Sequence, residues 1–233
     1  SIHKLASLPI LTPDFDVEKA ISDVEEEMSL RFSSMQKLAI RECFNKKILV
    51  ITGGPGTGKT TIIKAVVDIF HQWDKKILLV APTGRAAKRL AEATQWEAKT
   101  IHRTLEYNPG LGTFRRGEKR PLASDALIID EFSMVDLPLM YHLIKAVPFW
   151  MRLILVGDKD QLPAVGPGNL LQNIIESGMV EVVRLDEIFR QEKDSLIVLN
   201  AHRVNRGEPL IYPARGEKDS DFYFIQQEEE EKV

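Results

Sequence analysis

The sequence predicts an α/β fold with a mostly parallel sheet flanked by helices, and three observations indicate it. Apolar runs at 48–52, 76–81, 126–129 and 153–156 each fit a buried parallel strand. Polar residues follow each run, which is typical of a doubly wound sheet whose strand ends share one edge. Hydrophobic residues make up 44% of the 233 residues, which is enough for a sizeable core.

The composition indicates a globular chain without disulfides. Cys43 is the single cysteine, so a reducing setting is expected and a small core side chain is its predicted role. No apolar run approaches the ~20 residues of a membrane-spanning helix. The opening stretch, SIHKLASLPIL, is too short and too weakly apolar for a signal peptide. We therefore expect a cytoplasmic protein with no membrane partner.

The charge is distributed unevenly along the chain. The formal net charge is −3, but residues 1–27 carry seven acids against two bases, and residues 228–233 carry four against one. The remainder, 28–227, has 28 Lys+Arg against 23 Asp+Glu, a net charge of +5. This balance permits a phosphate-backbone partner without demonstrating one.

The first strand leads into the sequence GGPGTGKTT at 53–61, which fits the pattern G-x-x-x-x-G-K-T. A strand, a tight glycine turn and a helix from Lys59 to about His71 would aim backbone N–H groups at an anion. The Lys59 ammonium and the Thr60 hydroxyl would then reach nucleotide phosphates and their Mg²⁺. The predicted phosphate-binding residues are Gly54, Pro55, Gly56, Thr57, Gly58, Lys59, Thr60 and Thr61.

Two helices are predicted ahead of this loop. The first, near 17–28, has one apolar and one acidic face, which favours a solvated packing helix. Ser33 or Ser34 caps the second, which delivers Gln36 shortly before the loop. An amide offers a donor and an acceptor, the pair that suits an adenine edge, although an isolated glutamine would be an ordinary surface residue.

Acidic and amide side chains follow the third and fourth strands. Asp130 can hold Mg²⁺, and Glu131 can polarise the water that attacks a γ-phosphate. Asp158 and Gln161, in GDKDQLP, can report γ-phosphate occupancy, because the glutamine can bind either that oxygen or the attacking water. Because the carboxyl ends of parallel strands share one sheet edge, we expect these groups to gather at the phosphate loop.

Basic residues between the second and third strands suggest a nucleic-acid contact. Thr83 and Gly84 begin a helix that carries Arg85, and its first amides could bind a nucleic-acid phosphate. A solvated basic helix face is nearly as good an explanation, and the same ambiguity holds for Thr100, His102 and Arg103. His102 lacks the spacing of a metal ligand.

A β-hairpin is predicted next, with strands at 104–107 and 113–116 around a glycine-rich tip. This protrusion bears Tyr107, Leu111, Phe114, Arg115 and Arg116, which could wedge or stack against bases. A mobile surface ribbon explains the pattern equally well.

After residue 180 the sequence predicts a strand, then a helix from Ser195 to about Asn205, and one more strand at 222–225. Arg190 could reach the γ-phosphate from a neighbouring domain and stabilise transition-state charge. A surface salt bridge to Glu187 or Asp194 is the alternative. The closing acidic residues are expected to be solvated.

The ordered motifs resemble the superfamily 1B DNA helicases, closest to the RecD-like group. The resemblance runs from about Leu30 to Gly207. It implies a RecA-like fold and ATP-driven translocation along single-stranded DNA, in the 5′ to 3′ direction. The motifs are Gln36, GGPGTGKT at 53–60, APTGRAAKRL at 81–90, TIHRTLEY at 100–107, DEFSMVD at 130–136, GDKDQLPAVGPGNLL at 157–171 and LDEIFRQ at 185–191.

The resemblance implies roles for particular residues. Gln36 is similar to the adenine-reading glutamine, Gln161 to the γ-phosphate sensor, and Arg190 to the arginine that acts across two motor domains. Lys59 and Thr60 would bind phosphate and Mg²⁺, and Asp130 and Glu131 would hold the metal and activate water. Thr83, Gly84, Arg85, Thr100 and His102 match segments that line the single-strand track, and the hairpin resembles the pin where such helicases split a duplex.

The predicted domain organisation is a linker and helix at 1–29, a first RecA-like domain at 30–177 with the hairpin insert at about 104–121, and the incomplete start of a second domain at 178–233. Motifs of a complete second domain are missing, so we expect a motor fragment that binds ATP·Mg²⁺, hydrolyses it poorly and does not unwind DNA alone. Subunits of a recombination-repair complex are expected partners. An ATP-gated DNA- or protein-binding module is the alternative, whereas a GTPase or small-molecule kinase would need motifs that are absent here.

Overall fold

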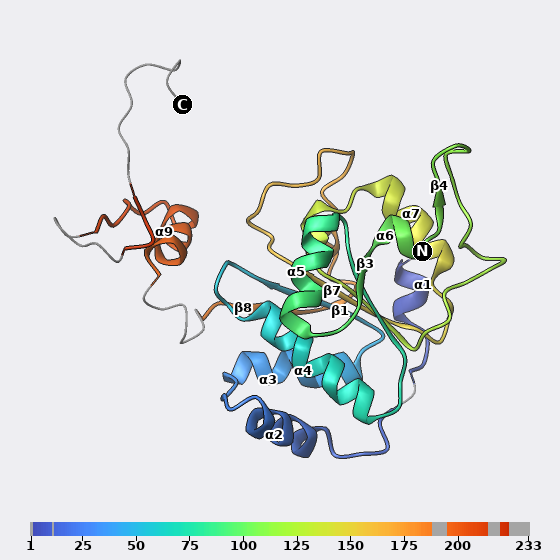
Figure 1. Cartoon of the computed structure of the whole chain (residues 1–233), viewed down its shortest axis with the longest axis horizontal. Helices are drawn as coiled ribbons and strands as arrows, with labels where there is room; N and C mark the ends of the chain where they lie inside the picture. Colours follow the sequence, from blue (N-terminus) through green and yellow to red (C-terminus); the bar gives the residue numbers. More distant parts are fainter. Residues whose placement is uncertain (1, 11, 188–194, 214–219, 224–233) are drawn as a thin grey trace.

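The computed structural model describes residues 2–10, 12–187, 195–213 and 220–223, and its centre is a six-stranded sheet (Figure 1). The strand order is β3-β2-β6-β7-β1-β8, and neighbouring strands run parallel throughout. The predicted α/β class is therefore confirmed. The strands are β1 (Ile48–Gly53), β2 (Ile77–Ala81), β3 (Ala98–Thr100), β6 (Ala126–Ile129), β7 (Arg152–Gly157) and β8 (Glu181–Leu185).

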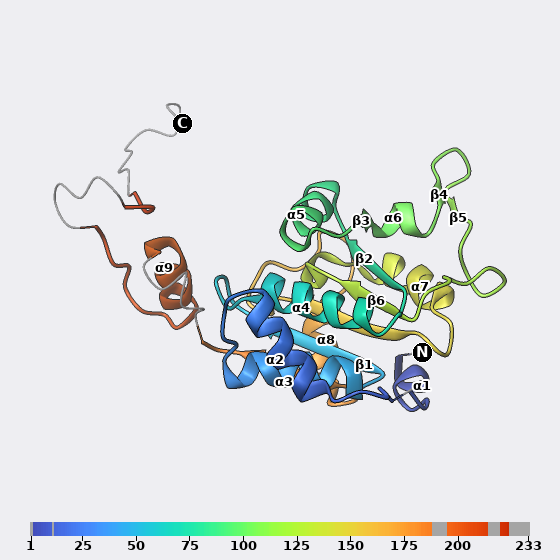
Figure 2. The same cartoon turned by 60° about the horizontal axis from the view of Figure 1, so that its bottom comes forward.

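Helices cover both faces of the sheet, because alternate strand residues point to opposite sides (Figure 2). In β1, Leu49 and Ile51 join one apolar core, whereas Ile48 and Val50 join the other. The first core is covered by α2 (Val17–Glu27), α3 (Ser34–Asn45), α4 (Lys59–Gln72) and α5 (Gly84–Thr94). The second is covered by α1 (Ile2–Ala6), α6 (Ile101–Thr104), the 3₁₀ turn η1 (Phe132–Met134), α7 (Leu137–Ala146) and α8 (Leu170–Ser177).

Short polar side chains begin the helices that carry the candidate site residues. Ser33 caps α3 and forms a capping box with Gln36, so the first of the two predicted cap residues is the right one. Thr83 caps α5 by accepting a hydrogen bond from Ala86 N. These caps fix where each helix starts and so set the direction of its first backbone amides.

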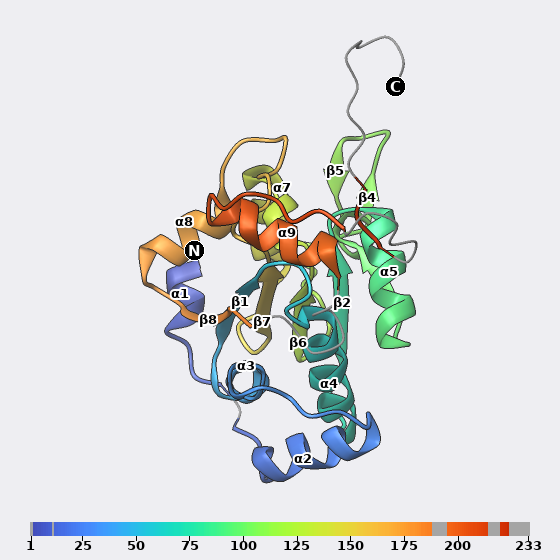
Figure 3. The same ribbon diagram turned by 90° about the vertical axis from the view of Figure 1, so that its left-hand side faces the viewer.

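Strand β8 corrects the predicted domain boundary at residue 177. It pairs in parallel with β1, with Val182 opposite Val50, and forms an edge of the same sheet. Residues 181–185 therefore belong to the first sheet and not to a second domain. The helix predicted from Ser195 is confirmed as α9 (Leu196–Asn205), which lies at the carboxyl edge of the sheet, beside the loop that follows β1 (Figure 3).

The hairpin is confirmed, but it is shorter than predicted. Its strands are β4 (Tyr107–Asn108) and β5 (Thr113–Phe114), and it projects from the body of the molecule (Figure 1). Thr104 lies in α6 and not in a strand, because Thr100 caps this turn by accepting from Arg103 N while Ile101 and Leu105 are buried beneath it.

Two further predictions concern the strand at 222–225 and membrane-spanning helices. Phe222 and Tyr223 do not lie in a strand, so this half of the strand predicted at 222–225 is wrong, and residues 224–225 lie outside the described residues. No helix in the described part of the chain has the length and apolar content that a membrane crossing requires.

Candidate active site

The predicted strand, loop and helix at 48–71 are confirmed as β1, the phosphate-type loop 53–58 and α4. Gly56 and Gly58 have φ values of 71° and 82°, a region that glycine enters without steric cost. These two positions let the chain turn back sharply between the strand and the helix. Helix α4 therefore begins directly at the loop with Lys59 and Thr60. The backbone N–H groups of its first turn make this end of the helix attractive to an anion.

Two carbonyl oxygens at the start of this loop accept hydrogen bonds from side chains. The Lys59 ammonium donates to Gly53 O at 2.6 Å and to Gly54 O at 2.8 Å. The Thr57 hydroxyl also donates to Gly54 O, at 2.8 Å. Carbonyl oxygens would repel an anion, so these contacts leave the backbone N–H groups as the polar groups available to a phosphate.

Gln36 is buried, with 2% of its surface exposed, and both ends of its amide are bonded inside the protein. Its Oε1 accepts from Ser33 N at 2.9 Å, and its Nε2 donates to Thr57 O at 3.0 Å. The amide thereby ties the start of α3 to the phosphate-type loop. An amide has two donor hydrogens and two acceptor lone pairs, so contact with an adenine edge stays a prediction.

The charge of Lys59 is set by opposing influences. Burial lowers the pKa of its ammonium, while the carboxylates of Asp158, Glu131 and Asp130 favour the charged form. Three strand ends, those of β1, β6 and β7, therefore bring one cation and three acids into electrostatic contact. This grouping at one sheet edge is what the order of strands and polar residues predicts.

Asp130 and Glu131 follow β6 directly. Burial, together with the neighbouring Glu131 carboxylate, raises the pKa of Asp130 to about 6. Glu131 has a φ of 52°, a left-handed conformation that is uncommon for a residue with a side chain. Such conformations cost free energy and cluster at functional sites, where they aim a side chain.

Gln161 contacts a residue that the sequence analysis missed. Ser133 Oγ donates to Gln161 Oε1 at 3.1 Å, and Ser133 is 7% exposed. This bond occupies the amide oxygen and leaves the Nε2 hydrogens of Gln161 free to donate to a phosphate oxygen. The signal available in the sequence was the position of Ser133 within DEFSMVD, two residues after Glu131.

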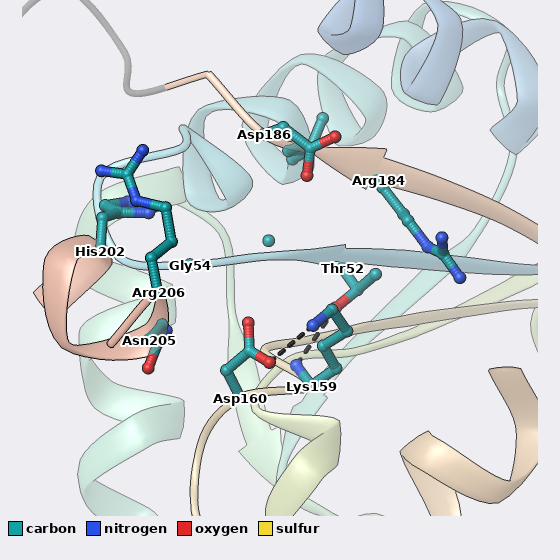
Figure 4. A pocket seen from close by; sticks show the side chains of 11 residues that line it. Thr52, Gly54, Lys159, Asp160, Arg184, Asp186, His202, Asn205 and Arg206 are labelled. Atoms are coloured by element: carbon teal, nitrogen blue, oxygen red, sulfur yellow. Dashed lines mark hydrogen bonds and ion pairs between the residues drawn. The ribbon is translucent and has the colours of Figure 1, made fainter. Parts of the chain in front are cut away.

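A cavity of about 390 Å³ lies in front of the loop (Figure 4). Lys159 connects two of its walls, because its backbone N donates to Thr52 Oγ1 at 3.2 Å and its ammonium pairs with Asp160 at 2.6 Å. Helix α9 closes the cavity on one side with His202 and Asn205, together with Arg206, which directly follows the helix. Arg190, the predicted arginine, lies outside the described residues.

A second cavity, of about 540 Å³, joins the candidate catalytic residues to the start of α5. Its walls include Thr60, Asp130 and Glu131 on one side and Thr83 and Arg85 on the other. Thr83, Gly84 and Arg85 are all exposed. The structure therefore brings part of the predicted nucleic-acid track next to the predicted catalytic acids.

The rest of the predicted track lies on α6 and the hairpin. The His102 ring lies 5.4 Å from that of Tyr107 and 5.6 Å from that of Phe114, and Phe114 lies 4.7 Å from His142 of α7. This group of rings joins the hairpin to the body. His102, Arg103 and Arg115 are exposed, whereas the hydroxyl of Thr100 is used as a helix cap.

Comparisons with known proteins agree with this geometry. The sequence profile of the family AAA_19, described as an AAA domain, matches residues 36–167. The chain is 40% identical over 186 residues to the ATP-dependent RecD2 DNA helicase of Deinococcus radiodurans, covering 80% of this chain and 25% of that relative. It is 37% identical over 215 residues to the RecBCD enzyme subunit RecD of Mycobacterium tuberculosis, covering 80% of this chain and 37% of that relative.

Among solved structures, the Pif1 helicase from Candida albicans matches 71% of this chain and 42% of its own chain, with 25% identity and a TM-score of 0.52. The expected RecA-like fold and the resemblance to RecD-like helicases are thus confirmed. The chain spans between a quarter and two fifths of the length of the two curated relatives, at 25% and 37%.

Proposed function

Because the chain belongs to the AAA_19 family of AAA domains, we propose that it is the first motor domain of an ATP-dependent DNA helicase. One observation carries this proposal, namely that groups from three strand ends face one phosphate-type loop. Lys59 interacts electrostatically with Asp130 and Glu131, and Gln161 is bonded to Ser133 of the segment that follows those acids. A cation, an acid pair and an oriented amide are the groups that phosphoryl transfer from ATP to water requires.

Nucleotide binding would use the loop amides and Lys59. In the proposed complex, Lys59 exchanges the carbonyls of Gly53 and Gly54 for the β- and γ-phosphates of ATP. Charge-assisted bonds to phosphate are stronger than bonds to neutral carbonyls, so the exchange favours binding. Gln36 would hold the loop in place through Thr57 O and offer its remaining amide groups to the adenine.

The acid pair fits a divalent cation. Burial and the adjacent Glu131 carboxylate disfavour ionisation of Asp130, and a nearby cation removes this penalty. Thr60 and Asp130 would hold Mg²⁺ through oxygen atoms, the ligand type that this metal prefers. When bound, the metal would supply positive charge that stabilises negative charge on the phosphates.

Glu131 would act as the general base for ATP hydrolysis. Its carboxylate accepts a proton from the attacking water, while Gln161 donates from Nε2 to the γ-phosphate or holds that water. Ser133 fixes the amide so that this donor, and not the carbonyl oxygen, is presented. Arg190 would stabilise the transition-state charge.

Single-stranded DNA would run past the cavity that joins α5 to the acids. Thr83, Gly84 and Arg85 would bind its phosphates, with Thr100, His102 and Arg103 further along. Phe114 and Arg115 on the hairpin would meet bases at a duplex junction. The adjacency of Arg85 to Asp130 and Glu131 supports a direct coupling between DNA contact and ATP turnover.

The remaining expectations are also proposals. A second RecA-like domain would supply the other half of the cleft, and residues after β8 would begin it. Cytoplasmic location, 5′ to 3′ translocation and assembly with subunits of a recombination-repair complex follow the resemblance to RecD-like helicases.

Nucleotide binding can be tested on this chain by titrating ADP and ATP with Mg²⁺ and comparing Lys59→Ala with Lys64→Ala. Both lysines lie on α4, but only Lys59 contacts the loop carbonyls. We expect Lys59→Ala to weaken binding by at least about tenfold while the chain still unfolds cooperatively, and Lys64→Ala to bind normally. Equal binding by both variants would refute the proposed site.

A further inference from the structure

The side chain of His202 lies beyond the residues that match the AAA_19 profile, and it contacts the phosphate-type loop. His202 lies on α9, whereas the family profile ends at residue 167. Its Nε2 lies 2.9 Å from Pro55 O, and a Cβ atom added to Gly54 would meet its Cε1 at 2.7 Å. The ring therefore rests directly on the backbone of Gly54 and Pro55; Figure 4 shows His202 beside Gly54.

Helix α9 is held at its start and in its middle, which fixes the position of this ring. At its start, Asp221 accepts from Ser195 Oγ at 2.5 Å and from Leu196 N at 2.9 Å. In its middle, the Asn200 amide donates to Ile211 O and accepts from Ile211 N, both at 2.7 Å, and Asn200 is 3% exposed. The histidine is thus presented by an anchored helix and not by a free surface turn.

The contact has a defined effect on the loop. Only a protonated Nε2 can donate to a carbonyl, so the ring nitrogen that faces Pro55 O carries its hydrogen. No peptide in the described chain is cis, and in a trans peptide the N–H points opposite to the C=O. Holding Pro55 O toward α9 therefore turns the Gly56 N–H away from α9.

Gln36 holds Thr57 O in the same manner. It precedes the loop in the sequence, whereas His202 follows it. Two peptides of the loop, Pro55–Gly56 and Thr57–Gly58, are thus each fixed through a carbonyl by a side chain from another helix. Their N–H groups are the ones that the proposed nucleotide site would offer to phosphate. Fixing them before binding reduces the ordering cost that binding must meet.

We propose that His202 is a positioning residue for the phosphate-binding loop, acting through the Pro55 carbonyl to orient the Gly56 N–H toward the nucleotide phosphates. This inference rests on the proposed nucleotide site. His202 contacts the loop backbone, and its proposed role involves neither the γ-phosphate nor the attacking water. Its removal therefore weakens ADP and ATP alike, and leaves the chemistry of bound ATP unchanged.

The test measures ADP·Mg²⁺ and ATP·Mg²⁺ affinity for His202→Ala, His202→Gln and Val204→Ala in the 233-residue chain. Loss of one hydrogen bond should weaken both nucleotides by about three- to tenfold in His202→Ala. His202→Gln should restore most of the affinity, because the glutamine Nε2 can replace the ring donor. Val204, 59% exposed on the same helix, is the matched control and should bind normally.

Gly54→Ala gives an independent variant that does not alter α9. Its new methyl group would displace the His202 ring, to which the three nearest heavy atoms of that position belong. Gly54→Ala should therefore weaken ADP binding in the wild-type chain and cause little further loss in the His202→Ala background. If His202→Ala failed to fold, His202→Phe, which keeps a ring but has no hydrogen-bond donor, would take its place in both comparisons.

Three results would overturn the inference. They are wild-type affinity in folded His202→Ala, equal loss in His202→Ala and His202→Gln, and additive losses in the double variant with Gly54→Ala. Lys59→Ala separates this failure from that of the site itself. If Lys59→Ala loses binding while His202→Ala does not, the nucleotide site stands and the role of His202 falls.

Discussion

At the scale of single residues, the candidate site is governed by charges that are buried together. Lys59 loses hydration but gains three acidic neighbours, whereas Asp130 loses hydration beside a second carboxylate. The pKa of Asp130 therefore rises to about 6, close to neutral pH. A carboxyl poised in this range responds strongly to an added cation, which makes its titration a sensitive report on the site.

The titration of Asp130 gives the first prediction. Because its folded pKa lies above the ordinary value of 3.8, the metal-free chain should lose stability as the pH rises from about 4 through 6. Glu131→Gln removes the adjacent charge and should lower the midpoint, and ATP with Mg²⁺ should lower it in the wild type. Carboxyl-carbon NMR measures both shifts, with exposed Asp23→Asn on α2 as the control. An unchanged midpoint in Glu131→Gln would contradict this account of the acid pair.

At the scale of elements, α2 is fastened to the site-bearing helix α3 by one buried acid. The Glu25 side chain is 1% exposed, pairs with Lys37 at 2.9 Å and Arg31 at 3.1 Å, and accepts from Phe32 N at 2.7 Å. Burial acts to raise the pKa of Glu25, but these hydrogen bonds outweigh it and the pKa is lowered. The carboxylate thus orders the turn that leads to Ser33 and Gln36.

Glu25→Gln should lower the free energy of unfolding by about 1–3 kcal/mol, because the amide loses charge-assisted bonds but keeps one acceptor. Glu26→Gln, at the exposed neighbouring position, should change it by less than about 0.5 kcal/mol. Urea unfolding at neutral pH measures both. The difference between them should shrink as the pH falls below the ordinary carboxyl pKa of 4.5, since a lowered pKa gives stability that acid removes.

The hairpin offers a matched pair of arginines. Arg115 is exposed, whereas Arg116 donates to Glu106 at 2.7 Å and to Pro121 O at 3.2 Å. Arg115→Ala should weaken single-stranded DNA binding and reduce its salt dependence without changing the melting temperature. Arg116→Ala should lower the melting temperature instead. Fluorescence anisotropy at several salt concentrations checks the first, and equal DNA binding by Arg115→Ala and the wild type would remove Arg115 from the track.

At the scale of the whole molecule, the sequence predicted the parallel sheet and the edge at which the candidate site residues gather. Glycine spacing, apolar runs and cap residues are local signals, and they located β1, α4 and the acids after β6. The membership of β8 in the first sheet was missed, because a short edge strand has the same local pattern in either domain. Ser133 and His202 were missed for a related reason, since their roles depend on contacts with residues 28 and 147 positions away.

This chain alone should hydrolyse ATP slowly, because it supplies only part of the proposed catalytic cleft. Its described residues supply the loop, the acid pair and the amide, whereas in the proposed motor Arg190 and a second domain would complete the cleft. We therefore expect nucleotide binding by the chain itself, with hydrolysis that rises steeply once a complete second RecA-like domain is present.

The most direct measurement is ATP hydrolysis by this chain and by a longer protein that contains a complete second domain, each with and without single-stranded DNA. We predict slow ATP turnover by the chain and DNA-stimulated turnover by the longer protein. In the longer protein, Glu131→Gln should abolish turnover. Arg190→Ala should reduce the turnover rate by a larger factor than it reduces the affinity for ATP. Nucleotide binding without DNA-stimulated turnover in the longer protein would contradict a motor, and would instead indicate an ATP-gated binding module.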